Sequence, residues 1–209
     1  MTTIKIHVIV FNFAVLAVLM LTSAATAEKI KAVDGFEYVT EEQLNAKWTI
    51  AATGFSGPVK IRLNTKDAKE GRQCLEVILP ATKADGIARL TLDVSTTVLL
   101  RDIAQVRFWL LVDRPESAGA SGLYLGDKEW KNYFVRYDIR KNQYGWQKIC
   151  VSLSDFKKEG AEPSLDTVTQ MRISLWFPGN QPANRILVDE LVWDNVEEKS
   201  LNLNREWWE

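Results

Sequence analysis

The chain has 209 residues, 25% of them charged, and a formal net charge of −1 at pH 7. A charge balance this even supplies no basic face, so nucleic acid is excluded as the expected partner. The sequence contains two cysteines and one histidine, His7.

The N-terminal residues have the pattern of a secretory signal peptide. Lys5 supplies a positive charge, an apolar run extends from Val8 to Leu21, and Ala25-Thr26-Ala27 matches a cleavage site. We expect residues 1–27 to be removed and the mature chain to be secreted, into the periplasm or the extracellular space; an uncleaved anchor is the alternative. No second long apolar run follows, so we expect no membrane association after cleavage.

Cleavage of the signal peptide also removes His7. Without histidine, the mature chain can form no Ser-His-Asp or Cys-His relay and no His-ligated zinc or haem site. Carboxylates, lysine, tyrosine and the two cysteines are the groups that remain for chemistry.

Short strands dominate the pattern after the signal peptide. Residues Thr40–Lys47 predict one or two helical turns, with Thr40 as the N-cap. Elsewhere apolar and polar residues alternate in short runs that are separated by Gly, Pro, Asn and Asp. In chain order, the predicted strands are Val33–Tyr38, Trp48–Ala52, Val59–Asn64, Gln73–Leu79, Ala88–Val94, Gln105–Val112, Gly122–Leu125, Asn132–Ile139, Gln147–Leu153, Gln170–Phe177 and Arg185–Trp193.

Many short strands with regular turn signals predict an all-β fold, a jelly-roll β-sandwich of two antiparallel sheets. We expect this domain to cover residues 28–196. The residues from 197 to 209 lose the alternation and are interpreted as a polar C-terminal tail.

Alternation along a strand also assigns its two faces. The residues assigned to the core of the two clearest strands are Val106, Phe108, Leu110, Val112, Ile173, Leu175 and Phe177. Their neighbours Arg107, Trp109, Arg172 and Trp176 are then expected on outer faces. Several outer faces therefore combine large aromatic side chains with arginine.

The two cysteines, Cys74 and Cys150, both lie in predicted strands and out of phase with the core positions. We therefore expect each of them on the face opposite the core. Export makes a disulfide chemically accessible, but a bridge needs Cα atoms within about 7 Å. A disulfide and two separate, half-buried thiols are both open at this stage.

Five sequence pieces occur in a characteristic order. They are Asp34-Gly35-Phe36-Glu37, Asp67-x-x-Glu70-Gly71-x-x-Cys74, Ile103-x-x-Val106-x-Phe108-Trp109, the run from Gly145-Trp146 to Asp155-Phe156, and Ile186-Leu187-Val188-Asp189-Glu190-Leu191. This order resembles the galactose-binding-like jelly-roll domains that include many carbohydrate-binding modules of extracellular glycan-degrading systems. The resemblance covers most of the chain after the signal peptide, and it is more specific for the fold than for the function.

The resemblance implies a structural calcium ion between the first strand, the last strand and an early loop. Glu37 and Asp189 match the positions of its carboxylate ligands, and a main-chain oxygen near Lys66 or Asp67 would complete part of the shell. The alternative is that both carboxylates solvate strand ends or pair with a lysine. The insert Thr40–Lys47 departs from the glycine-rich turn of the common form.

The resemblance also implies a non-catalytic module that binds a poly- or oligosaccharide on an aromatic sheet face. Sugars are recognised by flat aromatic rings with polar side chains around them. The candidate ligand-binding residues are Trp109, Trp130, Trp176, Tyr124, Arg107, Arg136 and Arg172. Three further tryptophans, Trp48, Trp146 and Trp193, match positions where this fold packs aromatics and are assigned to the core.

Two other classes of function stay open. One is a structural or adhesive β-sandwich module of a cell-surface assembly, with a partner that the sequence does not identify. The other is an enzyme, either a glycoside hydrolase with two carboxylates across a cleft or a polysaccharide lyase that uses Tyr137 near Arg136. No motif fixes a carboxylate pair among Glu37, Glu129, Asp138 and Glu190.

Overall fold

The computed structural model describes residues 31–94, 100 and 103–194. The predicted signal peptide, residues 1–27, and the predicted polar tail, residues 197–209, lie outside the described residues. Within the described part, none of the helices has the length and apolar character that a membrane crossing requires.

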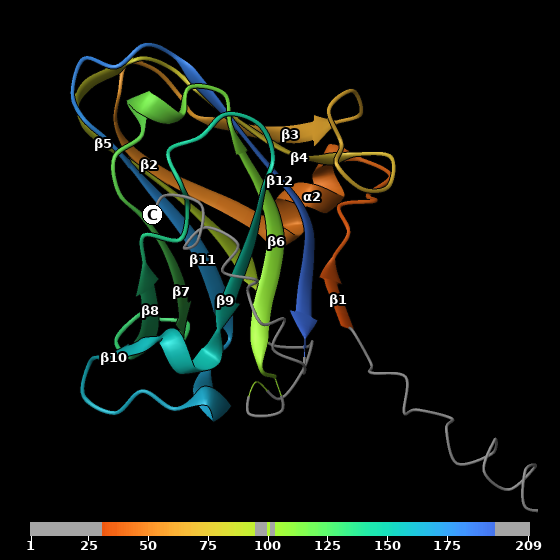
Figure 1. Ribbon diagram of the computed structural model, residues 1–209, viewed down its shortest axis with the longest axis vertical. Helices are drawn as coiled ribbons and strands as arrows, with labels where there is room; N and C mark the ends of the chain where they lie inside the picture. The colour runs from red at the N-terminus through yellow and green to blue at the C-terminus, as the bar shows by residue number, and fades with distance from the viewer. Residues whose placement is uncertain (1–30, 95–99, 101–102, 195–209) are drawn as a thin grey trace, which may run out of the picture.

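Two antiparallel sheets pack face to face and enclose the core (Figure 1). Sheet I contains, in spatial order, β3 (Lys60–Asn64), β4 (Cys74–Leu79), β12 (Asn184–Asp194), β6 (Gln105–Val112) and β9 (Gln147–Ser152), and β1 (Lys31–Asp34) also pairs with β12. Sheet II contains β10 (Lys157–Glu159), β8 (Tyr133–Tyr137), β7 (Ser121–Gly126), β11 (Gln170–Phe177), β5 (Thr82–Asp93) and β2 (Trp48–Phe55). The predicted all-β sandwich is confirmed.

Helical structure in the described residues is short, as predicted. Helix α2 (Glu41–Lys47) begins where the Thr40 side chain accepts the backbone N–H of Gln43, and its Leu44 is buried in the core. Single 3₁₀ turns occur at η2 (Pro115–Ser117), η3 (Leu153–Asp155) and η4 (Leu165–Thr167).

The core consists of the inward-facing residues of both sheets. Every residue assigned to the core from strand alternation is at most 2% exposed, so that assignment is confirmed. Trp48 and Trp193 are 1% and 0% exposed, as expected. Trp146 is only half-buried, because it directly precedes β9, which is an edge strand of sheet I among the described residues. Its assignment to the core was therefore wrong.

Both cysteines lie on the outer side of sheet I, as their phase predicted. Cys74 on β4 alternates with the core residue Leu75, and Cys150 on β9 alternates with Ile149 and Val151. β12 and β6 separate the two strands, a distance of roughly 14 Å at 4.7–4.9 Å per strand step. Neither cysteine is in a disulfide in the structure, so the disulfide alternative is excluded.

The carboxylate of Asp34 connects the two sheets where the chain leaves β1. It accepts the backbone N–H of Phe36 at 2.7 Å, the indole N–H of Trp48 at 2.7 Å and the hydroxyl of Tyr38. Phe36 has a left-handed backbone (φ 57°) and a fully buried ring 5.6 Å from the Trp48 ring. The predicted strand Val33–Tyr38 therefore ends at Asp34, because the side chain takes the N–H that a ladder would use.

Replacing Asp34 with alanine should destabilise the fold. The indole N–H of Trp48 would be buried without an acceptor, and we expect a loss of about 1–3 kcal/mol in the free energy of unfolding. Chemical denaturation monitored by tryptophan fluorescence measures this. Asp155→Ala, an exposed carboxylate in η3, is the control and should change stability by no more than about 0.5 kcal/mol. Equal losses in the two variants would contradict the role of Asp34.

Candidate functional site

The outer face of sheet II carries four of the seven predicted ligand-binding residues. On β7, Leu123 and Leu125 are fully buried in the core, so Tyr124 between them points outward. The register pairs Tyr124 with Arg172 on β11, and Trp176 lies four residues further along β11 on the same face. Trp130 reaches this face from the loop that follows β7.

Tyr124 is the centre of an aromatic cluster on this face. Its ring centroid lies 5.8 Å from that of Tyr133, 6.1 Å from that of Tyr137 and 6.4 Å from that of Trp176. A Cβ at Gly122 would lie 2.9 Å from the Tyr124 ring, so the ring occupies space that glycine leaves open. Burial, reinforced by the neighbouring Tyr137, raises the pKa of Tyr124. The hydroxyl therefore stays protonated at neutral pH and can both donate and accept a hydrogen bond.

Trp130 packs its ring onto the face rather than extending into solvent. A Cβ at Gly126 would lie 2.6 Å from the indole, so the ring rests on the backbone of that glycine. The Arg172 guanidinium carbon lies 3.6 Å from the ring centroid, which is the geometry of a cation–π stack. Trp130 is thus half-buried and fixed in position, with Arg172 fixed beside it.

The Asp127 carboxylate holds the loop that carries Trp130. One oxygen accepts the backbone N–H groups of Glu129 and Lys131, and the other accepts the backbone and side-chain N–H groups of Asn132. Burial alone would raise the pKa of Asp127, but the hydrogen bonds from Lys131, Asn132 and Glu129 outweigh it and lower the pKa. The ionised carboxylate therefore supports the left-handed backbone at Trp130 (φ 57°).

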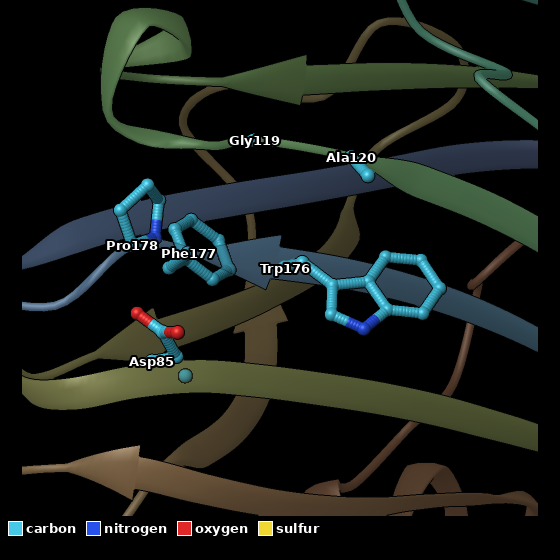
Figure 2. A pocket seen from close by; sticks show the side chains of 7 residues that line it. Asp85, Gly119, Ala120, Trp176, Phe177 and Pro178 are labelled. Carbon is cyan, nitrogen blue, oxygen red and sulfur yellow. The ribbon is translucent and has the colours of Figure 1, made fainter.

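A shallow depression of about 310 Å³ extends the face beyond Trp176 (Figure 2). It is lined by Trp176, by Pro178 just after β11, by Asp85 on β5 and by the segment at Gly119 and Ala120. Two backbone hydrogen bonds, Gly119 N–H to Trp176 O and Trp176 N–H to Ala120 O, hold this segment against β11. On this face the Trp176 ring is thus followed by a depression that has the Asp85 carboxylate at its edge.

Trp109 and Arg107 lie on the opposite side of the molecule, on the outer face of sheet I. The indole N–H of Trp109 donates to Glu190 at 3.2 Å, and the Lys69 ammonium lies 4.7 Å from the Trp109 ring centroid. Arg107 lies 3.7 Å from the same Glu190 carboxylate. Because β6 and β11 belong to different sheets, Trp109 does not share a platform with Trp176 and Trp130.

Arg136 is also separated from the aromatic cluster. It pairs in register with Leu123 and shares the side of β8 that carries the buried Phe134. Arg136 is exposed near the end of β8, beyond the residues that pair with β10. Arg136 therefore points away from Tyr124.

Arg89 is a residue of this face that the sequence reasoning missed. It lies on β5 between the buried Ala88 and Leu90, and the register places it opposite Ser174 of β11. The alternation from Ala88 to Leu92 was a sufficient signal for its outward direction. It was missed because no aromatic residue stands beside it in the sequence.

Glu37 and Asp189 both hold the loop between β3 and β4. Asp189, 1% exposed, accepts the backbone N–H groups of Lys69 and Glu70 on one oxygen and that of Glu190 on the other. Glu37 accepts the backbone N–H and the Nε–H of Arg72. Burial raises the pKa of Asp189, and its three N–H donors offset part of that rise.

The N–H groups bound by Glu37 and Asp189 join the loop between β3 and β4 to the segment after β1 and to β12, at the place where the resemblance implies calcium. Among the described residues there is no group of three or more Asp, Glu, His or Cys side chains that could hold a metal ion. The oxygens of Glu37 and Asp189 already accept hydrogen bonds from N–H groups. In this arrangement the two carboxylates do not fit a calcium site, which needs several oxygen ligands directed at one ion. Calcium at Glu37 and Asp189 stays a prediction of the sequence resemblance.

Comparisons with known proteins identify the fold. No family model and no curated protein matches the chain. The family 11 carbohydrate-binding module from Clostridium thermocellum, solved in complex with a β-1,3-1,4-mixed-linked tetrasaccharide, matches with a TM-score of 0.57 and 15% identity over 82% of this chain and 98% of that chain. The family 30 module of a cellulosomal cellulase of the same organism matches with a TM-score of 0.50 and 14% identity, over 70% and 91% of the two chains.

An exo-β-agarase also matches, with a TM-score of 0.54 and 13% identity, over 79% of this chain but 25% of that chain. The matched part is therefore one portion of a larger enzyme. Identities this low show the fold alone, which is the jelly-roll β-sandwich of the carbohydrate-binding-module type that the sequence predicts.

Removing the Asp127 carboxylate should disorder the Trp130 loop without unfolding the sandwich. We expect Asp127→Ala to raise the accessibility of tryptophan to acrylamide quenching, with little change in melting temperature. In the wild type the folded pKa of Asp127 lies below its unfolded value of about 3.9, so the loop's support is present above that pH and is lost as the pH falls. Quenching identical to that of the wild type at pH 7 would contradict this role.

Calcium binding is tested by melting curves of chelator-treated protein. If an ion binds the native state alone, calcium at a hundredfold excess over its Kd stabilises it by about 2.7 kcal/mol, and the melting temperature rises by several degrees. Asp189→Asn should abolish this rise, whereas Glu162→Gln, an exposed change elsewhere, should retain it. An unchanged melting curve in calcium would reject the site.

Proposed function

We propose that this chain is a non-catalytic carbohydrate-binding module, which binds a poly- or oligosaccharide on the outer face of sheet II. The observation that carries the proposal is the aromatic cluster around Tyr124, with Trp176 and Trp130 on the same face. Aromatic rings fixed on a rigid sheet stack against the apolar faces of sugar rings, and neighbouring polar groups bond to the hydroxyls.

The structural neighbours support this assignment. Two of them are carbohydrate-binding modules over nearly their whole length, and one was solved with an oligosaccharide bound. The predicted signal peptide agrees with it, because a module of this kind meets its polysaccharide outside the cytoplasm. The proposed partner is therefore a glycan, encountered by a secreted protein.

The outward carboxylates of β5 do not form the pair that a glycoside hydrolase needs. They are Asp85 and Asp93, eight residues apart along one strand. At about 3.4 Å per residue the separation is roughly 27 Å, whereas a hydrolase needs its two carboxyl groups about 5–9.5 Å apart. The tyrosine and arginine suggested for a lyase, Tyr137 and Arg136, point to opposite sides of β8.

Binding is tested first on an array of plant, algal and bacterial polysaccharides, followed by titration calorimetry on each positive polymer. The decisive variant is Trp176→Ala, which removes a half-buried ring that lies outside the core. We expect it to weaken binding by about 1–3 kcal/mol and to leave the melting temperature nearly unchanged. Trp130→Ala should act in the same direction.

Trp109→Ala is the matched control, because this tryptophan lies on the outer face of sheet I. It should leave every binding isotherm unchanged. If it weakens binding as much as Trp176→Ala does, the binding face has been assigned to the wrong sheet. If the wild type binds no polymer on the array, the structural or adhesive alternative is favoured over glycan binding.

A further inference from the structure

Two arginine side chains project side by side from the centre of the aromatic face. The register pairs Arg172 on β11 with Thr91 on β5, and Ser174 on β11 with Arg89 on β5. Arg89 and Arg172 are therefore diagonal neighbours on adjacent strands, about 7–8 Å apart, with their Cβ atoms somewhat closer than that. Both are half-buried.

No described carboxylate forms an ion pair with either arginine. Arg172 donates from Nε to the Thr91 hydroxyl at 3.1 Å and stacks on the Trp130 ring. No described residue accepts a hydrogen bond from its terminal amino groups. Burial lowers the pKa of Arg172, and the nearby positive charge of Arg89 lowers it further. The second effect is expected when two cations lie close together.

The outer face of sheet I shows the opposite arrangement. There Arg62 pairs with Glu76 at 2.5 Å, Arg107 with Glu190 at 3.7 Å, and Arg185 with Asp67 and Asp113, each at 2.7 Å. The same chain thus neutralises the arginines of one face, whereas Arg89 and Arg172 on the other have no carboxylate partner among the residues that the structure describes. Like charges at neighbouring positions of a sheet destabilise it, so the pair on sheet II is a cost to the free protein.

We propose that the ligand of this face is an anionic glycan, with a carboxylate or sulfate group bound between Arg89 and Arg172 while adjacent sugar rings lie on Trp176 and Tyr124. This inference rests on the proposed function and adds the charge class of the polysaccharide. The guanidinium of Arg172 is already oriented by Trp130 and Thr91. Its side chain therefore loses little conformational entropy when it binds an anion.

The net charge of the chain argues against a non-specific attraction between the whole protein and anionic polymers. At −1 overall, the protein has no general attraction for polyanions, and a positive site must come from local placement. Binding through this site should therefore depend on Arg89 and Arg172, and not on cations elsewhere on the surface.

The test compares polymers that differ in charge alone. The probes are polygalacturonate, the same polymer with its carboxyl groups reduced to alcohols, dextran sulfate and unsubstituted dextran. We expect the wild type to bind at least one anionic member about tenfold or more tighter than its neutral counterpart, with affinity that falls as salt is raised. Polygalacturonate against its reduced form tests recognition of a carboxylate, and dextran sulfate against dextran tests recognition of a sulfate.

Arg89→Gln and Arg172→Gln should each weaken binding of the anionic polymer by about tenfold or more. Lys60→Gln, which removes the same charge from an exposed position on β3, should leave it unchanged. Arg89→Gln should also melt at or above the temperature of the wild type, because the repulsion between the cations is relieved.

Three outcomes would overturn the inference. If the neutral polymers bind as tightly as the anionic ones, and the binding depends on Trp176, glycan binding stands and the charge class is wrong. If Lys60→Gln weakens anion binding as much as Arg172→Gln does, the attraction is non-specific. If no polymer binds, the proposed function and this inference fail together.

Discussion

The candidate binding face depends on the close packing of two sheets. Leu90, Leu123 and Ile173 are all fully buried between them. Because neighbouring residues of a strand point to opposite sides, burial of these three positions forces Arg89, Tyr124 and Arg172 outward onto one surface. The core therefore determines which side chains a ligand can meet, before any loop is considered. Asp34, through its hydrogen bond to Trp48, fixes how the first strands of the two sheets meet.

The side chains of the aromatic face are held by contacts within the protein. Two glycines, Gly122 and Gly126, leave space above the sheet into which Tyr124 and Trp130 settle. The Asp127 carboxylate fixes the loop that carries Trp130, and Trp130 in turn orients the guanidinium of Arg172. A face assembled in this way would lose little conformational entropy on binding the glycan that we propose, which matters because hydrated sugars offer modest interaction energy.

The two outer faces of the sandwich are made from similar residues and differ in how these are paired. On sheet I, Trp109 and Arg107 are both held by Glu190, so aromatic and cationic groups are satisfied within the protein. On sheet II the corresponding groups, Trp176 and Arg172, have no carboxylate partner among the described residues. This difference in pairing, and not the composition of either face, is the reason that we propose sheet II as the ligand-binding surface.

The sequence by itself determined the fold class, the position of helix α2 and the inward set of each main strand, because periodicity and capping are local properties. It also identified Trp176, Trp130, Tyr124 and Arg172 as candidates. It could not say that Trp109 belongs to the other side, because alternation gives the direction of a side chain relative to its own sheet and not which sheet the strand joins. Nor could it show that Arg89 and Arg172, 83 positions apart in the sequence, become neighbours. Strand order and register decide both, and these depend on long-range pairing that no local pattern contains.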